Sequence, residues 1–132
     1  MISRLVEPEV LARALGRPEI APLVDGFDPG DWLASPRNVA LVDQVGNIAL
    51  FANRGNRVFE GHTLFVSRGR AAIEIGRLMV NAAFEIYGAR AVWGMTPLER
   101  RAARWFTRQL GFRSLGTVET VRGPCELFFK GV

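Results

Sequence analysis

Between residues 57 and 95 the hydrophobic period of the sequence changes twice. Residues 57–66 form an extended run, and after it the apolar residues recur at three- and four-residue steps as far as Ile86. Gly88 ends this helical pattern, and residues 89–95 form another extended run. A strand, a long helix and a second strand in this order predict a right-handed crossover that joins two parallel strands.

The rest of the chain predicts shorter elements around this unit. Turn residues between strand-like runs favour an antiparallel meander before the crossover, and Gly and Pro residues between 25 and 36 indicate an irregular loop. The expected elements are helices at 7–16, 19–24 and 98–110 and strands at 38–42, 48–52, 113–121 and 126–130. Together they predict one α/β domain over residues 1–132, in which a mixed sheet packs against helices.

The composition excludes several classes of protein. One cysteine, Cys125, and one histidine allow neither an internal disulfide nor an ordinary zinc site, so we expect no metal. The longest apolar run, 48–52, is too short for a membrane span and no secretory signal is recognisable, so we expect a cytoplasmic protein. The net charge of +4 comes mostly from arginine, and such a chain can bind nucleic acid, a membrane surface or a phosphate-rich cofactor.

A basic turn joins the strand that ends at Val66 to the long helix. Its residues are Arg68, Gly69, Arg70, Ala71 and Ala72. Free amides at the start of a helix bind anions, and glycine lets a ligand approach the backbone closely. Arginine is otherwise unfavourable at the positive end of a helix. The turn is therefore either a phosphate site or an ordinary connection with solvent-facing arginines.

Glu60 and His62 are two residues apart in the strand before this turn, so their side chains lie on one face of the sheet. Histidine titrates near neutral pH, and a neighbouring carboxylate can orient it or act as a base itself. Taken alone, this pair is also consistent with a structural histidine beside a glutamate at a solvated edge.

Arg100, Arg104 and Arg108 are spaced to share one face of the last helix. Such a stripe is either a solvated surface or a contact for phosphate or nucleic acid. Few aromatic residues accompany it, which argues against nucleic-acid binding. Trp32, in the loop between 25 and 36, is a candidate for lining a pocket or for packing.

The order of these motifs resembles the GNAT superfamily of acetyl-CoA-dependent N-acetyltransferases. The resemblance covers about residues 38–130 and rests on the turn at 68–72, the strand at 91–97 and the segment 100–112. Within that segment the family pattern is matched by Ala103, Phe106, Gly111 and Phe112. The whole chain is similar to a compact branch that is often found in phage and prophage genomes.

The resemblance implies a mixed, mostly antiparallel sheet with a V-shaped splay between two parallel central strands and helices on both faces. It also implies that acetyl-CoA binds in the splay. The coenzyme would be bound by the amides of residues 68–72, by Leu64, Phe65 and Val66, and by Arg100 and Arg104. An amide near Phe65 or Val66 would polarise the thioester carbonyl.

The reaction that the resemblance implies is direct acetyl transfer to a primary amine of a small molecule or peptide. His62 or Glu60 would be the base, and Trp32 and Met95 are candidates for the substrate side. The family's asparagine position falls on Arg100, and its tyrosine acid falls on Thr107. A binding protein with little or no activity is therefore the alternative. Exposed edge strands also allow a homodimer.

Overall fold

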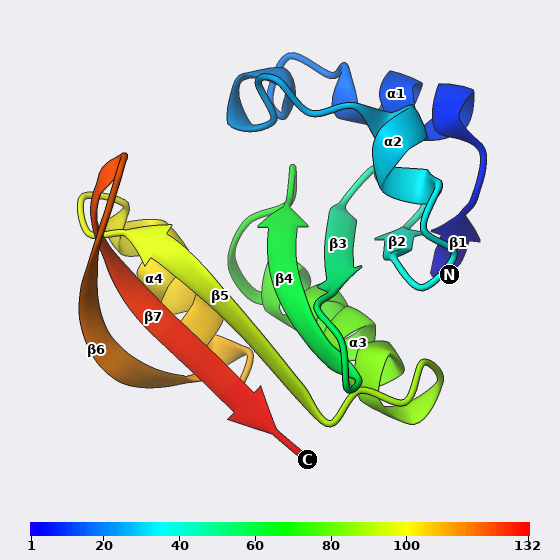
Figure 1. Ribbon diagram of the computed structural model, residues 1–132. Coiled ribbons are helices and arrows are strands. Elements are labelled where there is room, and N and C mark those ends of the chain that lie inside the picture. Colours follow the sequence, from blue (N-terminus) through cyan, green and yellow to red (C-terminus); the bar gives the residue numbers. More distant parts are fainter.

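The computed structural model describes residues 1–132 as one seven-stranded sheet with helices on both of its faces (Figure 1). The elements in chain order are β1 (Ser3–Leu5), α1 (Pro8–Leu15), the 3-10 helix η1 (Ala21–Leu23), α2 (Pro29–Leu33), β2 (Val39–Val42), β3 (Ile48–Asn53), β4 (Val58–Leu64), α3 (Gly69–Glu85), β5 (Ala91–Pro97), α4 (Arg101–Gln109), β6 (Arg113–Thr120) and β7 (Gly123–Gly131). The strand order is β1-β2-β3-β4-β5-β7-β6, and only β4 and β5 run parallel. The predicted class and the parallel pair are therefore confirmed.

Two elements differ from the sequence-based expectation. The loop expected at 25–36 contains α2, because the Asp28 carboxylate accepts hydrogen bonds from the amides of Gly30 and Asp31 and caps a short helix. β1 was not expected at all. It has three residues and is a strand because it pairs with β2, a long-range contact that its own sequence does not encode.

Two hydrophobic clusters cover the two faces of the sheet. On one face, Leu11 and Leu15 of α1 pack with Ile48, Leu50 and Leu64. On the other face, α3 packs its buried side chains against β2, β3, β4 and β5. Alternation along the strands explains the division, because successive side chains of a strand point to opposite faces. No helix has both the length and the apolar character that a membrane span requires.

The sheet opens at its centre. β4 and β5 pair only over Val58–Glu60 and Ala91–Trp93. Beyond these residues β4 continues beside β3, and β5 continues beside β7 as far as Pro97. We call the opening between residues 61–64 and 94–97 the wedge. The expected V-shaped splay is therefore confirmed, and Figure 1 shows β4 and β5 diverging at this point.

Glycines occupy both strands where they diverge. A Cβ atom on Gly94 would lie 3.0 Å from the carbonyl oxygen of Gly61, and a Cβ on Gly61 would lie 3.0 Å from Cγ1 of Val92. Both distances are shorter than ordinary van der Waals contacts. The absence of side chains at these two positions therefore lets the strands stay close at the apex of the wedge.

Candidate active site in the wedge

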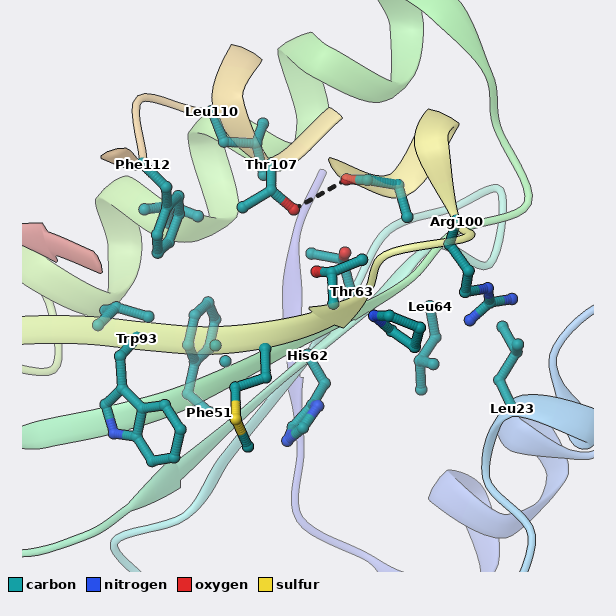
Figure 2. Close-up of a pocket in the computed structure, with 18 residues that line it drawn as sticks. Leu23, Phe51, His62, Thr63, Leu64, Trp93, Arg100, Thr107, Leu110 and Phe112 are labelled. Atoms are coloured by element: carbon teal, nitrogen blue, oxygen red, sulfur yellow. Dashed lines mark hydrogen bonds between the residues drawn. The ribbon is translucent and has the colours of Figure 1, made fainter. Parts of the chain in front are cut away.

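Two adjoining hollows occupy the wedge and its mouth. A cavity of about 190 Å³ lies between the open ends of β4 and β5, and Figure 2 shows the residues that line it. A larger hollow of about 550 Å³ lies between α4 and the turn that follows β4. Thr63, Arg100, Ala103 and Leu23 line both of them. A long ligand can therefore run from the turn into the wedge.

The turn at the start of α3 offers unpaired backbone donors. The amides of Arg68, Gly69, Arg70 and Ala71 donate no hydrogen bond within the protein, and no side chain caps the helix. Gly69 has a φ of +64°, and no atom lies within 4 Å of the position that its Cβ would occupy. Free amides and open space at a helix start form a site for an anion such as a phosphate.

Asn47 holds the chain immediately before these amides. Its side chain is fully buried, and its Oδ1 accepts hydrogen bonds from the amides of Val66 (2.8 Å) and Ser67 (2.9 Å). Its Nδ2 donates to Asp43 Oδ2 and to Ser67 Oγ, both at 2.9 Å. The amide of Val66 is consequently occupied, whereas that of Phe65 donates no hydrogen bond within the protein. Of the two amides suggested for polarising a carbonyl, only Phe65 is free.

Hydrogen bonds to Asp43 fix the carboxylate that supports Asn47. Burial raises the pKa of Asp43, but hydrogen bonds from the Asn47 side chain and from the amides of Asn47, Gly46 and Val45 outweigh this effect. The pKa of Asp43 is therefore below its ordinary value, and the carboxylate is ionised at neutral pH. In the sequence Asp43 and Asn47 are typical residues of a turn between two strands, and nothing in the linear pattern indicates the contact of Asn47 with residues 66 and 67.

His62 and Glu60 of β4 lie within hydrogen-bond distance of each other, and Arg54 donates hydrogen bonds to Glu60. Nε2 of His62 lies 2.9 Å from Oε2 of Glu60, while Arg54 donates to Oε1 of Glu60 through Nε (3.0 Å) and Nη2 (2.7 Å). The side chain of Glu60 is 16% exposed and that of His62 is 48% exposed. Because the carboxylate accepts from Nε2–H, Nδ1 of His62 keeps a lone pair that can take a proton.

Only His62 of this pair lines the wedge cavity. Glu60 lies behind it, with both carboxylate oxygens already engaged by His62 and Arg54. The geometry therefore suits His62 as a proton acceptor and Glu60 as the group that orients it. Sequence reasoning missed Arg54, which the turn between β3 and β4 brings opposite Glu60.

Some of the other candidate residues line one or both hollows, and the rest line neither. Leu64 and Met95 line the wedge cavity, Phe65, Arg68 and Gly69 line the larger hollow, and Arg100 lines both. Val66, Arg70, Ala71, Ala72, Arg104 and Trp32 line neither. Trp32 packs instead against Phe27, with ring centroids 5.9 Å apart.

Of Arg100, Arg104 and Arg108, the last two pair with one buried acid. Arg104 contacts Glu126 of β7 at 3.4 Å, and Arg108 pairs with the other carboxylate oxygen of Glu126. Burial raises the pKa of Glu126, but the Ser114 hydroxyl and the two guanidinium groups together lower it by more. The pKa of Glu126 is therefore below its ordinary value. The single carboxylate therefore offsets one of the two positive charges and holds both guanidinium groups toward β7.

Thr107, at the position where the resemblance expects a tyrosine, lines the wedge cavity. Its hydroxyl donates to the carbonyl oxygen of Ala103 at 3.0 Å, as the dashed line in Figure 2 shows. The hydroxyl hydrogen is therefore engaged within α4. In the same view Thr107 lies on one side of the β5 ribbon, and His62 and Trp93 lie on the other.

Comparison with solved structures shows what fold this arrangement belongs to. An aminoglycoside acetyltransferase in complex with coenzyme A and kanamycin matches with a TM-score of 0.70 at 15% identity, over 99% of this chain and 95% of that one. An acetyltransferase of the GNAT family from Streptococcus pneumoniae matches with a TM-score of 0.69 at 16% identity, over 100% and 98%. A spermidine N-acetyltransferase mutant from Vibrio cholerae matches with a TM-score of 0.69 at 12% identity, over 99% and 94%.

No protein-family model and no curated protein sequence matches the chain. The likeness is therefore one of structure, and it extends over nearly the full length of each of these neighbours. The expected phage-type branch has no support among them. The chain has the fold of the GNAT-family acetyltransferases.

Proposed function

We propose that the protein transfers the acetyl group of acetyl-CoA to a primary amine while both are bound. The observation that carries this proposal is the wedge itself, which has unpaired amides at one end and His62 in its wall. The free amides, the open space at Gly69 and the hollow of about 550 Å³ fit a phosphate-bearing chain. Structural neighbours that hold coenzyme A support the same ligand.

Residues of the turn and of β4 bind the coenzyme in this proposal. The amides of Arg68–Ala71 bind the pyrophosphate, and Arg100, which lines both hollows, adds positive charge beside it. Leu64 and Phe65 contact the apolar arm, and the free Phe65 amide donates to the carbonyl oxygen as charge develops on it. Acetyl-CoA supplies an activated thioester carbonyl and a thiolate leaving group.

His62 prepares the acceptor. An ammonium group has no lone pair with which to attack, so Nδ1 of His62 removes one proton, directly or through a water molecule. Glu60 accepts the hydrogen bond from Nε2–H and stabilises the imidazolium that forms, while two hydrogen bonds from Arg54 hold Glu60 in position. The nitrogen loses a second proton as the amide forms, and since the Thr107 hydroxyl is engaged with Ala103, this proton would pass through water to the departing thiolate.

Removal of the base tests this role. We expect His62→Ala to lower kcat by about 100- to 10,000-fold, because proton transfer by a positioned side chain contributes about this much. The affinity for acetyl-CoA should stay within about twofold, since His62 lies on the acceptor side. Calorimetry with acetyl-CoA gives the affinity, and thiol release with a panel of primary amines gives the rate. Thr117→Ala on exposed β6 is the matched control and should change neither.

A coenzyme-binding protein without transferase activity is the second candidate, and the engaged Thr107 hydroxyl favours it. It predicts acetyl-CoA binding, no thiol release with any amine, and no effect of His62→Ala or Glu60→Ala on any readout. Failure of acetyl-CoA to bind at millimolar concentration would contradict both candidates.

A further inference from the structure

The acceptor must lie on the face of the sheet that carries His62. Side chains alternate along a strand, and Glu60 pairs directly with Trp93 across the parallel contact. His62 therefore shares its face with Trp93 and Met95 of β5, and all three side chains line the wedge cavity. An amine within reach of His62 would therefore have an indole ring and a thioether beside it.

The same face continues onto β7 as an apolar surface. Phe129 is the cross-strand partner of Trp93, and Leu127 is the partner of Met95, so these four side chains are neighbours on one face. The cluster beneath α1 includes no residue of β5, β6 or β7, and α4 lies on the opposite face. Figure 1 likewise shows no helix in front of β5 and β7. The surface beside His62 is therefore apolar and open.

No acidic side chain lines the wedge cavity. None of the 18 residues that line the cavity is an aspartate or a glutamate. Glu60, the nearest acid in the strand, has both oxygens engaged by Arg54 and His62. Farther along the face, the Arg113 guanidinium lies 5.5 Å from the centre of the Phe129 ring. A substrate with several ammonium groups would find no carboxylate for the groups that do not react.

We propose that the acceptor is a primary amine with a single ammonium group on an aromatic or aliphatic body, and that Trp93 and Met95 bind this body. The proposal rests on the proposed function, because it assigns the acceptor class of the same site. A ring stacked on Trp93 is buried against apolar atoms, while the amine at its end reaches His62.

Binding of two probe amines to the protein saturated with coenzyme A tests this assignment without turnover. We expect 2-phenylethylamine to bind at least tenfold more tightly than spermidine by calorimetry. Trp93→Ala should weaken 2-phenylethylamine about tenfold, the order expected when burial of one ring face is lost. Leu78→Ala, at an exposed apolar residue on α3, is the matched control and should leave this affinity unchanged.

A second variant tests the same assignment even if Trp93→Ala fails to fold. Met95 is 41% exposed, so Met95→Glu adds a carboxylate without burying it. This variant should bind spermidine at least fivefold more tightly and 2-phenylethylamine more weakly than the wild type does.

Three results would overturn the assignment. The first is that spermidine binds more tightly than 2-phenylethylamine. The second is that the amine affinities of both variants equal those of the wild type. The third is that the protein is a dimer, which Trp93→Ala converts to a monomer without a change in amine binding. The last result would identify the apolar face as a subunit interface. Absence of acetyl-CoA binding contradicts the proposed function instead, and the amine titrations can then be made on the free protein.

Discussion

At the scale of single residues, the geometry of the site depends on a buried amide side chain. Asn47 forms hydrogen bonds with the amides of Val66 and Ser67 and with the side chains of Asp43 and Ser67. It thereby fixes the two residues that precede the unpaired amides of the turn. Because these two amides are engaged, an incoming anion meets only the donors from Arg68 onward.

Truncation of Asn47 should therefore affect stability and coenzyme binding together. We expect Asn47→Ala to lower the free energy of unfolding by about 2–4 kcal/mol, because it leaves buried donors without partners. Acetyl-CoA should also bind about tenfold more weakly, since the turn loses its anchor. Urea denaturation and calorimetry measure the two effects. Asn81→Ala, on the exposed side of α3, should change neither, and an equal loss in both variants would contradict this role.

At the scale of elements, α4 is attached to the rest of the molecule without a fully buried side chain of its own. None of its residues from Arg101 to Gln109 is fully buried, and Leu110, just after the helix, is its buried apolar contact. At Gly76 of α3, a Cβ would lie 2.7 Å from Cδ2 of Leu110, so the glycine permits close approach of the two helices. α4 is also held by Phe106, which packs against the same core cluster, and by Arg77 of α3, which donates to the carbonyl oxygen of Gln109 at 3.0 Å. Arg104 and Arg108 in turn pair with buried Glu126 of β7.

Loss of the Glu126 charge should destabilise the protein in a pH-dependent way. The folded-state pKa of Glu126 is lowered from the ordinary 4.5, so its contribution is present above pH 4.5 and is lost as pH falls through the lower, folded-state value. We expect Glu126→Gln to lower the free energy of unfolding by about 2 kcal/mol at pH 7, typical of hydrogen bonds to charged groups. Urea denaturation from pH 7 to pH 3 should show this difference shrinking at the acidic end. A difference that is constant with pH would exclude the charge as its cause.

The two strands that form the wedge depend on the glycines at its apex. We expect Gly94→Ala to lower the free energy of unfolding by about 1–3 kcal/mol, because the new methyl group would crowd the backbone oxygen of Gly61. It should also reduce kcat/KM, since the methyl group lies in the wall of the cavity. Gly131→Ala in β7 is the matched control, because its Cβ would meet Phe129 at an ordinary 3.4 Å. Equal, small effects of both changes would refute the steric argument.

At the scale of the whole molecule, the fold consists of two arms that meet at the base of the V. One arm is β1–β4 with α1, α2 and α3, and the other is β5–β7 with α4. The sheet joins them over only the residue pairs Val58–Ala91, Phe59–Val92 and Glu60–Trp93. A ligand in the two hollows touches both arms, so it should stabilise the molecule as a unit.

Coenzyme binding should therefore raise the stability of the entire domain. At a free acetyl-CoA concentration of about 100 times Kd, the free energy of unfolding should rise by about 2.7 kcal/mol. This corresponds to an increase in Tm of about 10 °C for a domain of this size. Differential scanning calorimetry measures the shift, and hydrogen exchange should slow in both the β4–α3 turn and α4. Protection confined to one arm would contradict a ligand that bridges them.

The sequence alone determined the order of the main helices and strands and the parallel crossover. These follow from local hydrophobic periods and from a chirality that holds for all such units, so they need no knowledge of distant contacts. The placement of Glu60 and His62 on one face follows in the same way from alternation along β4. The junction between β4 and α3 also follows from sequence, because a strand–turn–helix connection is a local feature, while the binding role of its residues stays a prediction.

Contacts between distant parts of the chain set which of these residues are free to act. Glu126 engages Arg104 and Arg108, and Asn47 engages the Val66 amide, although both partners are far away in the sequence. Arg54 likewise engages Glu60 and leaves His62 with the available nitrogen. Hydrogen bonds and ion pairs depend on distances of a few ångströms between side chains, and the packing of the sheet and helices sets those distances.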